Sequence, residues 1–254
     1  MKEKINETKK ITVKAETKTT TKKVNDTLDV VYILDRSGSM CNITNDTIGG
    51  YNSYVKKQLK NKVKLTTVLF DDQYEMITDR MDIKKVKELD DTTYYARGCT
   101  ALYDAIGKTI NYISSKKTNK VLFIITTDGL ENASREFDRN KVKELITKHK
   151  DWEFMYIGAD IDAYGEASLI GIDRDHTANY KKDKKGTRIL YDTLSEATCV
   201  MCENECLGAS WKKDLDDYIN EEIDNLDDLD TFIIDRDGNL YNNGKKKSNN
   251  KKSK

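Results

Sequence analysis

Hydrophobic and polar residues follow two different periods along the chain from Leu28 onward. Short, nearly continuous apolar runs rich in β-branched side chains are typical of strands buried on both faces of a parallel sheet. The run Tyr74–Thr78 follows another such run across three polar residues, which predicts a hairpin and one antiparallel edge strand. The other expected strands are Leu28–Leu34, Val63–Phe70, Val121–Thr127 and Trp152–Ile157.

Segments with apolar residues three and four positions apart separate these runs, and this spacing is typical of amphipathic helices. Strands that alternate with helices through short connections predict a doubly wound α/β fold. We expect a mostly parallel sheet with helices on both faces, and such sheets bind ligands at the carboxyl ends of their strands. The expected helices are Ile48–Leu59, Leu102–Ile113, Arg139–Lys148, Ala163–Leu169 and Gly186–Val200.

Charge is balanced over the whole chain but unevenly distributed along it. Because 44 basic residues match 44 acidic ones, no overall charge favours nucleic acid or an anionic membrane as a partner. Residues 1–24 and 245–254 are rich in Lys and poor in apolar residues, so we expect both ends to be disordered. Residues 25–206 would form the α/β domain, and residues 207–244 an acidic helix and a hairpin appended to it.

Hydropathy bears on the location of the protein. The mean hydropathy is −0.75, and the longest apolar stretch, Val121–Ile125, is far shorter than the roughly 20 residues that span a bilayer. The first residues, MKEKINETKK, contain no apolar segment typical of a secretory signal. We therefore expect no membrane association and a cytoplasmic location, or a virion location if a phage encodes the chain.

The candidate chemistry begins where the first expected strand ends. The segment Asp35-Arg36-Ser37-Gly38-Ser39-Met40 places a carboxylate and two hydroxyls at alternate positions of a tight loop. Such hard oxygen donors suit Mg²⁺ or Mn²⁺. Further oxygens are available from Thr100, before an expected helix, and from Asp128, after an expected strand. Capping of the next helix is an alternative role for the loop, but it leaves these two distant residues unexplained.

Three separated segments carry a resemblance to a known family. DRSGSM, GCTALYDAIG and FIITTDG occur in the order typical of a von Willebrand factor type A (VWA) domain with a metal-ion-dependent adhesion site (MIDAS). The resemblance covers roughly residues 28–200, and DTIGGYNSY, TTVLFDD and DGLENASRE are similar to stand-alone bacterial and phage members. It implies that the two serines and, depending on the state of the site, the threonine bind the metal directly, and that the aspartates often act through water. The implied metal residues are Asp35, Ser37, Ser39, Thr100 and Asp128.

The resemblance implies binding without catalysis. Neutral hydroxyl donors leave a divalent ion electrophilic, and a partner's carboxylate can displace a metal-bound water. We expect a module that captures an Asp or Glu of a partner protein, with Arg36, Arg97 and Asp160 at the rim of the ligand site. Two alternatives are a virion or assembly component with a non-essential metal site and a metal-assisted phosphoester hydrolase. The partner's identity and the oligomeric state remain open.

The five cysteines form an odd number, which indicates reduced thiols. Cys41 and Cys99 flank the expected metal-binding segments, and we expect them to be small buried thiols. The alternative is a redox-sensitive gate beside the ion. Cys199, Cys202 and Cys206 would share one helix face. Because no histidine is near in sequence, packing is expected there in preference to metal binding.

Overall fold

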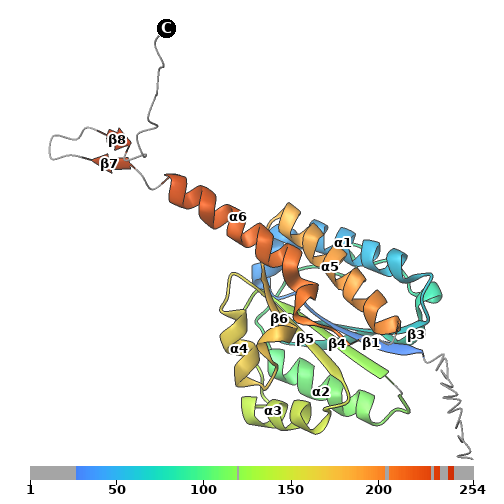
Figure 1. Ribbon diagram of the computed structural model, residues 1–254. Helices are drawn as coiled ribbons and strands as arrows, with labels where there is room; N and C mark the ends of the chain where they lie inside the picture. The colour runs from blue at the N-terminus through green and yellow to red at the C-terminus, as the bar shows by residue number, and fades with distance from the viewer. Residues whose placement is uncertain (1–26, 119, 204–205, 230–231, 235–239, 243–254) are drawn as a thin grey trace, which may run out of the picture.

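The computed structural model describes a central six-stranded sheet with the strand order β3-β2-β1-β4-β5-β6 (Figure 1). The middle strand β1 (Leu28–Asp35) runs parallel to β2 (Val63–Phe70) and to β4 (Lys120–Thr127). The expected disordered ends lie outside the described residues. The structure describes residues 27–118, 120–203, 206–229, 232–234 and 240–242.

The outer strands confirm the predicted antiparallel edge and add one strand. β3 (Tyr74–Asp82) pairs antiparallel with β2. On the other side, β5 (Glu153–Ala159) and β6 (Thr177–Tyr180) continue the parallel arrangement. The sequence pattern did not reveal β6, because four residues are too few to display a period and two of them, Thr177 and Asn179, are polar.

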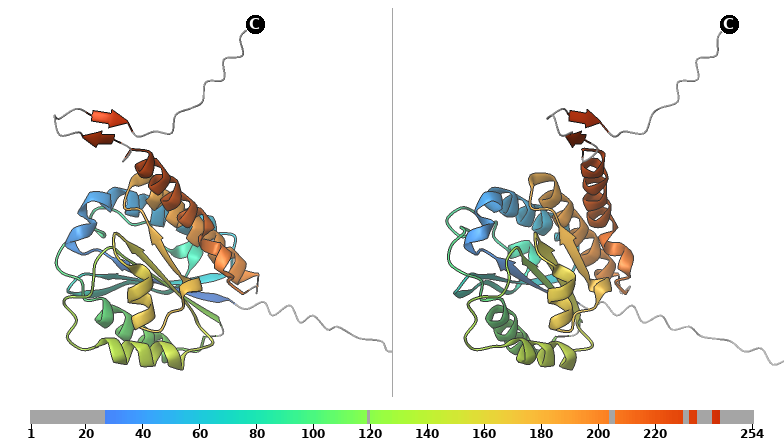
Figure 2. Two further views of the ribbon diagram at one scale, coloured as in Figure 1. Left: turned by 60° about the vertical axis from the view of Figure 1, so that its left-hand side comes forward. Right: turned by 90° about the vertical axis from the view of Figure 1, so that its left-hand side faces the viewer.

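Helices cover both faces of the sheet, with α1 and α5 on one face and α2, α3 and α4 on the other (Figure 2). Aspartate side chains cap three of them: Asp138, Asp162 and Asp183 accept backbone N–H groups in the first turns of α3, α4 and α5. The observed bounds lie close to the predicted ones. They are α1 (Thr44–Gln58), α2 (Leu102–Ser114), α3 (Arg139–Lys148), α4 (Ala163–Leu169), α5 (Lys184–Cys202) and α6 (Lys213–Leu229), with short 3₁₀ turns at Gly38–Ile43, Ile83–Lys85, Arg174–His176 and Ala209–Lys212.

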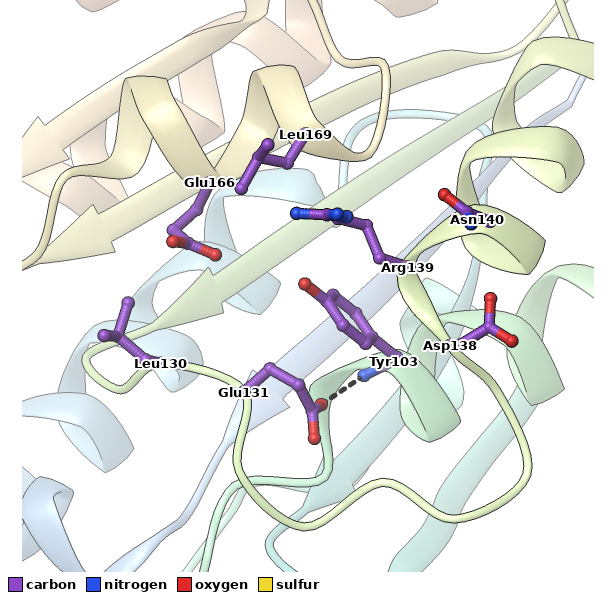
Figure 3. A pocket seen from close by; sticks show the side chains of 8 residues that line it. All are labelled: Tyr103, Leu130, Glu131, Asp138, Arg139, Asn140, Glu166 and Leu169. Carbon is purple, nitrogen blue, oxygen red and sulfur yellow. Dashed lines mark hydrogen bonds between the residues drawn. The ribbon is translucent and has the colours of Figure 1, made fainter.

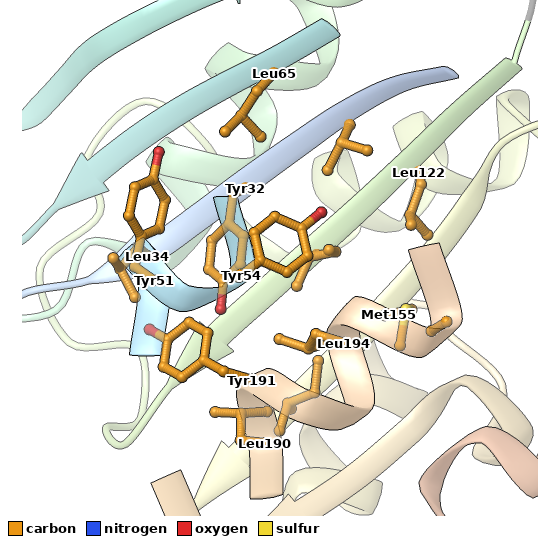
Figure 4. Close-up of a cluster of buried hydrophobic side chains, with 14 of the residues drawn as sticks. Tyr32, Leu34, Tyr51, Tyr54, Leu65, Leu122, Met155, Leu190, Tyr191 and Leu194 are labelled. Atoms are coloured by element: carbon orange, nitrogen blue, oxygen red, sulfur yellow. The ribbon is translucent and has the colours of Figure 1, made fainter. Parts of the chain in front are cut away.

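The apolar layer under α1 and α5 is rich in tyrosine (Figure 4). The buried ring of Tyr32 meets Tyr51 and Tyr54 edge-on and stacks on Tyr191, with centroid distances of 5.8–6.3 Å. The hydroxyl of Tyr51 forms a 2.6 Å hydrogen bond with Thr67, so its polar end is satisfied inside the core. Every helix among the described residues is too short or too polar to span a lipid bilayer.

The C-terminal segment packs onto the domain through α5 and β6. Lys212 is buried, and its Nζ donates to the carbonyl oxygens of Arg174 at 2.6 Å and Thr177 at 2.8 Å. Two further strands, β7 (Phe232–Ile234) and β8 (Leu240–Asn242), pair antiparallel as the predicted hairpin requires. The predicted turn at Asp237-Gly238 lies outside the described residues.

Candidate metal centre at the carboxyl ends of the strands

The candidate site lies at the carboxyl ends of β1 and β4, where the strand order of the sheet reverses direction. Loops that leave such a point diverge to opposite faces and open a crevice between them. Backbone hydrogen bonds join the loops that enclose it. Gly38 N donates to Gly98 O at 3.2 Å, and Asn132 N donates to Thr100 O at 3.0 Å. Gly98 holds φ at 66°, a conformation that glycine adopts without strain.

Asp35 lies at the base of the site and is fully buried. One carboxylate oxygen accepts the backbone N–H of Ser37 at 2.6 Å, and the other accepts the Thr127 hydroxyl at 2.6 Å. Burial raises the pKa of Asp35 to about 6, although the hydrogen bonds from Thr127 and Ser37 act in the opposite direction. The carboxylate therefore fixes the start of the DRSGSM loop. Its burial separates it from water, and this disfavours its charged form.

Two short contacts link the serine hydroxyls to the second carboxylate, that of Asp128. Ser37 Oγ and Ser39 Oγ are 3.1 Å apart, and Ser39 Oγ donates to Asp128 Oδ1 at 2.5 Å. Thr100 is also buried, and its Oγ1 lies 2.9 Å from the place that a Cβ on Gly129 would occupy. A side chain at position 129 would therefore crowd Thr100, and glycine allows its hydroxyl to approach the segment that carries Asp128.

The donor set has the chemistry of a site for a hard divalent ion. Two carboxylates and three hydroxyls meet at one edge of the sheet, and oxygen donors of this kind suit Mg²⁺ or Mn²⁺. Among the described residues no cluster of three His, Cys, Asp or Glu side chains could hold a metal. A metal in this region would therefore depend on the hydroxyl oxygens. Metal coordination by Asp35, Ser37, Ser39, Thr100 and Asp128 stays a prediction.

A loop between β4 and α3 holds Thr100 in place. The Asp104 carboxylate accepts the backbone N–H groups of Arg135, Glu136 and Phe137 at 2.8–3.0 Å. Glu131 accepts the N–H of Tyr103, which starts the first turn of α2. The sequence analysis assigned no role to these two acids. The sequence did offer one signal for Asp104: an acid in the first turn of a helix often interacts with backbone N–H groups.

Arg36 occupies a different place from the expected ligand rim. It is only 1% exposed, and its guanidinium contacts Asp71 at 3.1 Å and Glu75 at 2.8 Å. Arg97 is partly exposed, contacts the same Asp71 oxygen at 2.6 Å and lies over the Tyr95 ring. Arg36 is therefore a buried structural residue, which corrects the expectation for it, whereas Arg97 remains at the surface.

Lys182 is the residue at this site that the sequence analysis missed. It lies two residues after the end of β6, and its Nζ lies 3.0 Å from Asp128 Oδ2, 3.7 Å from Asp160 Oδ2 and 3.4 Å from the carbonyl oxygen of Ser39. Burial lowers the pKa of this amine, but the interactions with Asp128 and Asp160 outweigh burial and raise it overall. An ammonium group of the chain itself thus contacts two of the expected metal residues, Asp128 through its carboxylate and Ser39 through its carbonyl.

The cysteines differ in part from expectation. Cys41 and Cys99 are both exposed instead of buried: Cys41 lies in the 3₁₀ turn Gly38–Ile43, and Cys99 follows the bend at Gly98. Cys199 and Cys202 are partly buried on α5, and Asn61 Nδ2 donates to the Cys199 sulfur at 3.3 Å. Cys206 lies beyond the end of α5 at Cys202 and is exposed, so the expected single helix face holds for the first two cysteines only. Burial raises the pKa of the Cys202 thiol to about 11, so this thiol stays protonated at neutral pH.

A pocket of about 490 Å³ adjoins the same loops (Figure 3). Leu130, two residues after Asp128, forms one wall, and α4 supplies Glu166 and Leu169 opposite it. The Arg139 side chain extends from the start of α3 toward Glu166. The pocket is lined by Tyr103, Leu130, Glu131, Asp138, Arg139, Asn140, Glu166 and Leu169.

Comparisons with known proteins identify the fold. No family model matches the sequence, and no curated protein matches it. The VWF domain of the type V pilus tip protein Mfa5 from Porphyromonas gingivalis matches at 14% identity and a TM-score of 0.55, over 70% of this chain and 97% of that one. The PilB minor pilin from Streptococcus sanguinis matches at 10% identity and a TM-score of 0.55, over 71% and 63% of the respective chains.

A third structure contains a metal. Proximal thread matrix protein 1 from the mussel byssus, with a zinc-occupied MIDAS motif, matches at 15% identity and a TM-score of 0.52, over 69% of this chain and 46% of that one. At such identities the likeness defines the fold alone. The chain has a doubly wound α/β architecture, and within that class it has the VWA fold, as the sequence predicted. The pilus and byssus neighbours lend no support to the expected cytoplasmic location.

Proposed function

We propose that the chain is a protein-binding module that depends on a divalent metal, Mg²⁺ or Mn²⁺, and captures an Asp or Glu of a partner. The observation that carries this proposal is the convergence of Ser37, Ser39 and Asp128 at the reversal point of the sheet, with Asp35 buried behind them. The zinc-occupied MIDAS motif of the byssus protein shows that a protein of this fold can hold a divalent metal, which supports the proposal.

Each residue of the set has a distinct part in this function. Ser37, Ser39 and Thr100 would hold the ion through their hydroxyl oxygens, and Asp35 and Asp128 would balance its charge. A bound ion would supply a Lewis-acidic position for one carboxylate oxygen of the partner. Asp35 keeps the Ser37 backbone in place through its 2.6 Å hydrogen bond, so the loop is ordered before any ion arrives.

The neighbouring side chains favour binding over hydrolysis. A metal-assisted hydrolase needs a general base within hydrogen-bond reach of an attacking water. The chain has two histidines, and both have partners elsewhere: His149 contacts Ser114 at 2.8 Å, and His176 contacts Glu153 at 2.9 Å. Both also line a separate pocket with Trp152.

An assembly component is the second candidate, because Mfa5 and PilB are pilus proteins. In that case the contacts of the chain with its neighbours would persist without metal. Oligomeric state and partner capture, each measured with and without EDTA, separate the two functions.

Direct metal titration tests the leading proposal. Mn²⁺ binding by the full chain, followed by the loss of the free-ion electron paramagnetic resonance signal, should show one site per chain. Ser37→Ala and Ser39→Ala should each weaken it by about 10- to 100-fold. Ser168→Ala, an exposed serine on α4, is the matched control and should bind like the wild type.

Partner capture completes the test. Immobilised chain with Mg²⁺ should retain a protein from native lysate that EDTA releases and that Ser39→Ala fails to retain. The proposal is wrong if the wild type binds no Mn²⁺, or if the retained protein stays bound in EDTA.

A further inference from the structure

We propose that Lys182 is an internal competitor for the metal. Its ammonium group pairs with Asp128 Oδ2 when no ion is bound, and it moves away when a divalent ion binds. This inference rests on the proposed metal site. It adds a residue that sets how tightly the site holds its ion, and it gives the Asp128 carboxylate a positively charged partner before any ion binds.

The contacts of the ammonium group are those of a bound cation. Its three oxygen neighbours come from different loops, namely Asp128 Oδ2, Asp160 Oδ2 and the Ser39 carbonyl. The other oxygen of Asp128 accepts the Ser39 hydroxyl. Both oxygens of this carboxylate are therefore occupied, and an ion that binds near Asp128 meets a positive charge already 3.0 Å from it.

Burial makes this competition effective. The Asp128 side chain is fully buried and the Lys182 side chain is 19% exposed, so solvent and salt screen their interaction weakly. A divalent ion and an ammonium group beside one carboxylate repel each other. Metal binding must therefore either expel the ammonium group or tolerate its charge, and in both cases the measured affinity falls.

The surroundings of Lys182 allow the side chain to leave while the backbone stays. The next residue, Asp183, caps α5 through the N–H of Gly186 at 2.7 Å, which fixes the chain just after Lys182. β6 fixes the chain just before it, ending at Tyr180. A lysine carries its charge on a flexible stem of four carbons, so the ammonium group can swing into solvent without unfolding this link.

Asp160 gives the displaced lysine a second contact outside the metal shell. Its carboxylate is 3.7 Å from Lys182 Nζ and its side chain is 61% exposed. Its backbone adopts φ of 54°, a left-handed conformation that Asp tolerates better than most residues. Lys182 can therefore retain Asp160 while it releases Asp128.

Metal titration of Lys182→Met tests this inference, because methionine keeps the length of the stem and removes the charge. With Mn²⁺ as the probe, Lys182→Met should bind about three- to fivefold more tightly than the wild type, because displacing the lysine costs the ion the free energy of one partly exposed ion pair. Lys181→Met removes the same charge one residue away, where the amine contacts Asp183 instead of Asp128, and should leave the affinity within about 1.5-fold of the wild type.

The outcomes separate the two proposals. Equal affinities of the wild type and Lys182→Met, or weaker binding by the variant, overturn the role of Lys182 and leave the metal site intact. Absence of Mn²⁺ binding by the wild type and both lysine variants overturns the metal site itself. Circular dichroism and thermal unfolding of each variant verify that it is folded.

Amine labelling of the unmodified chain tests the movement without a substitution. Acetylation by a water-soluble ester, followed by peptide mass spectrometry, should modify Lys182 slowly in EDTA and several-fold faster in saturating Mg²⁺. Lys181 provides the internal reference and should keep its rate. An unchanged rate at Lys182 in Mg²⁺, under conditions where Mn²⁺ titration shows binding, overturns the displacement.

Discussion

Two clusters of basic side chains and carboxylates lie among the same loops. They differ in whether their ion pairs are fixed or can be exchanged for a metal ion. In the first, Arg36 and Arg97 share one oxygen of Asp71, and both Arg36 and Asp71 are buried. In the second, Lys182 contacts Asp128 and Asp160 and is partly exposed. A guanidinium group fits its acceptors with a planar fork, whereas an ammonium group is a point charge on a flexible stem. The comparison indicates a fixed cluster beside an exchangeable one.

Hydrogen bonds to Asp71 explain why the arginine cluster is fixed. Its side chain also accepts the N–H of Gln73 at 2.6 Å, and its carbonyl accepts the N–H of Ala101 at 2.8 Å. Asp71 thus joins the end of β2 to the segment that carries Thr100. The arginines neutralise a carboxylate that the loops require, while Lys182 neutralises a carboxylate that a metal would share.

Removing Arg36 should produce the largest loss of stability. Arg36→Met leaves the buried Asp71 carboxylate without its most buried cation, and breaking a buried pair in this way costs about 3–5 kcal/mol of unfolding free energy. Urea unfolding of the metal-free chain measures it. Arg188→Met, at an exposed arginine on α5, should change stability by less than about 0.5 kcal/mol. A loss below about 1 kcal/mol for Arg36→Met would remove the distinction between the clusters.

Asp35→Asn should stabilise the metal-free chain at pH 7 while it weakens metal binding. The pKa of Asp35 is about 6 in the folded protein against an ordinary 3.8, so the folded state holds the proton more tightly than the unfolded state. The stability contributed by this group therefore falls as pH rises from 3.8 to 6, by up to about 3 kcal/mol.

Unfolding at pH 4 and pH 7 measures this effect. The asparagine variant should lose less stability than the wild type between the two values, and Asp151→Asn, at an exposed aspartate, should behave like the wild type. If Asp35→Asn is less stable than the wild type at pH 7, its carboxylate supports the fold more than burial opposes it.

Metal should stabilise the chain through the second cluster alone. At a free Mg²⁺ concentration roughly thirty times the dissociation constant, binding to the folded state adds about 2 kcal/mol to the unfolding free energy. Thermal unfolding with Mg²⁺ and with EDTA measures the gain. Arg97→Ala, in the arginine cluster, should retain the gain, whereas Ser39→Ala should lose most of it. An equal gain in both variants would place the ion elsewhere.

Lys182→Met should have the smallest effect on stability. A partly exposed ion pair contributes about 0–1 kcal/mol, so the metal-free variant should unfold within about 1 kcal/mol of the wild type. The same urea experiment as for Arg36→Met gives the direct comparison. A loss as large as that of Arg36→Met would make Lys182 a fixed structural residue.

The sequence predicted most of the fold because local periodicity determines most of its elements. The observed bounds of α3, α4 and β2 are the predicted ones, and the antiparallel edge followed from the short polar link after Phe70. β6 was missed, and with it the position of Lys182, since the strand forms only by pairing with β5. Periodicity is a property of neighbouring residues, and this pairing depends on distant ones.

The candidate site was predicted in its residue types but only in part in its contacts. The conjunction of Asp35, Ser39 and Asp128 followed from the rule that ligands gather at strand ends. The buried position of Arg36 could not be predicted in this way. Its partner Asp71 is 35 residues away, and the sequence gives the charge of a residue but not the partner that neutralises it. The exposure of Cys41 likewise depends on how the 3₁₀ turn Gly38–Ile43 directs its side chain.

The buried amine of Lys212 has a consequence for how the molecule avoids self-association. β6 is an edge strand, and edge strands with free carbonyl groups can recruit strands from other molecules. Lys212 donates a hydrogen bond to the Thr177 carbonyl of that strand, and α6 begins at the next residue, Lys213. Shortened versions that stop before residue 209 would uncover this edge, and they should form sheet-rich aggregates at concentrations where the whole chain stays dispersed.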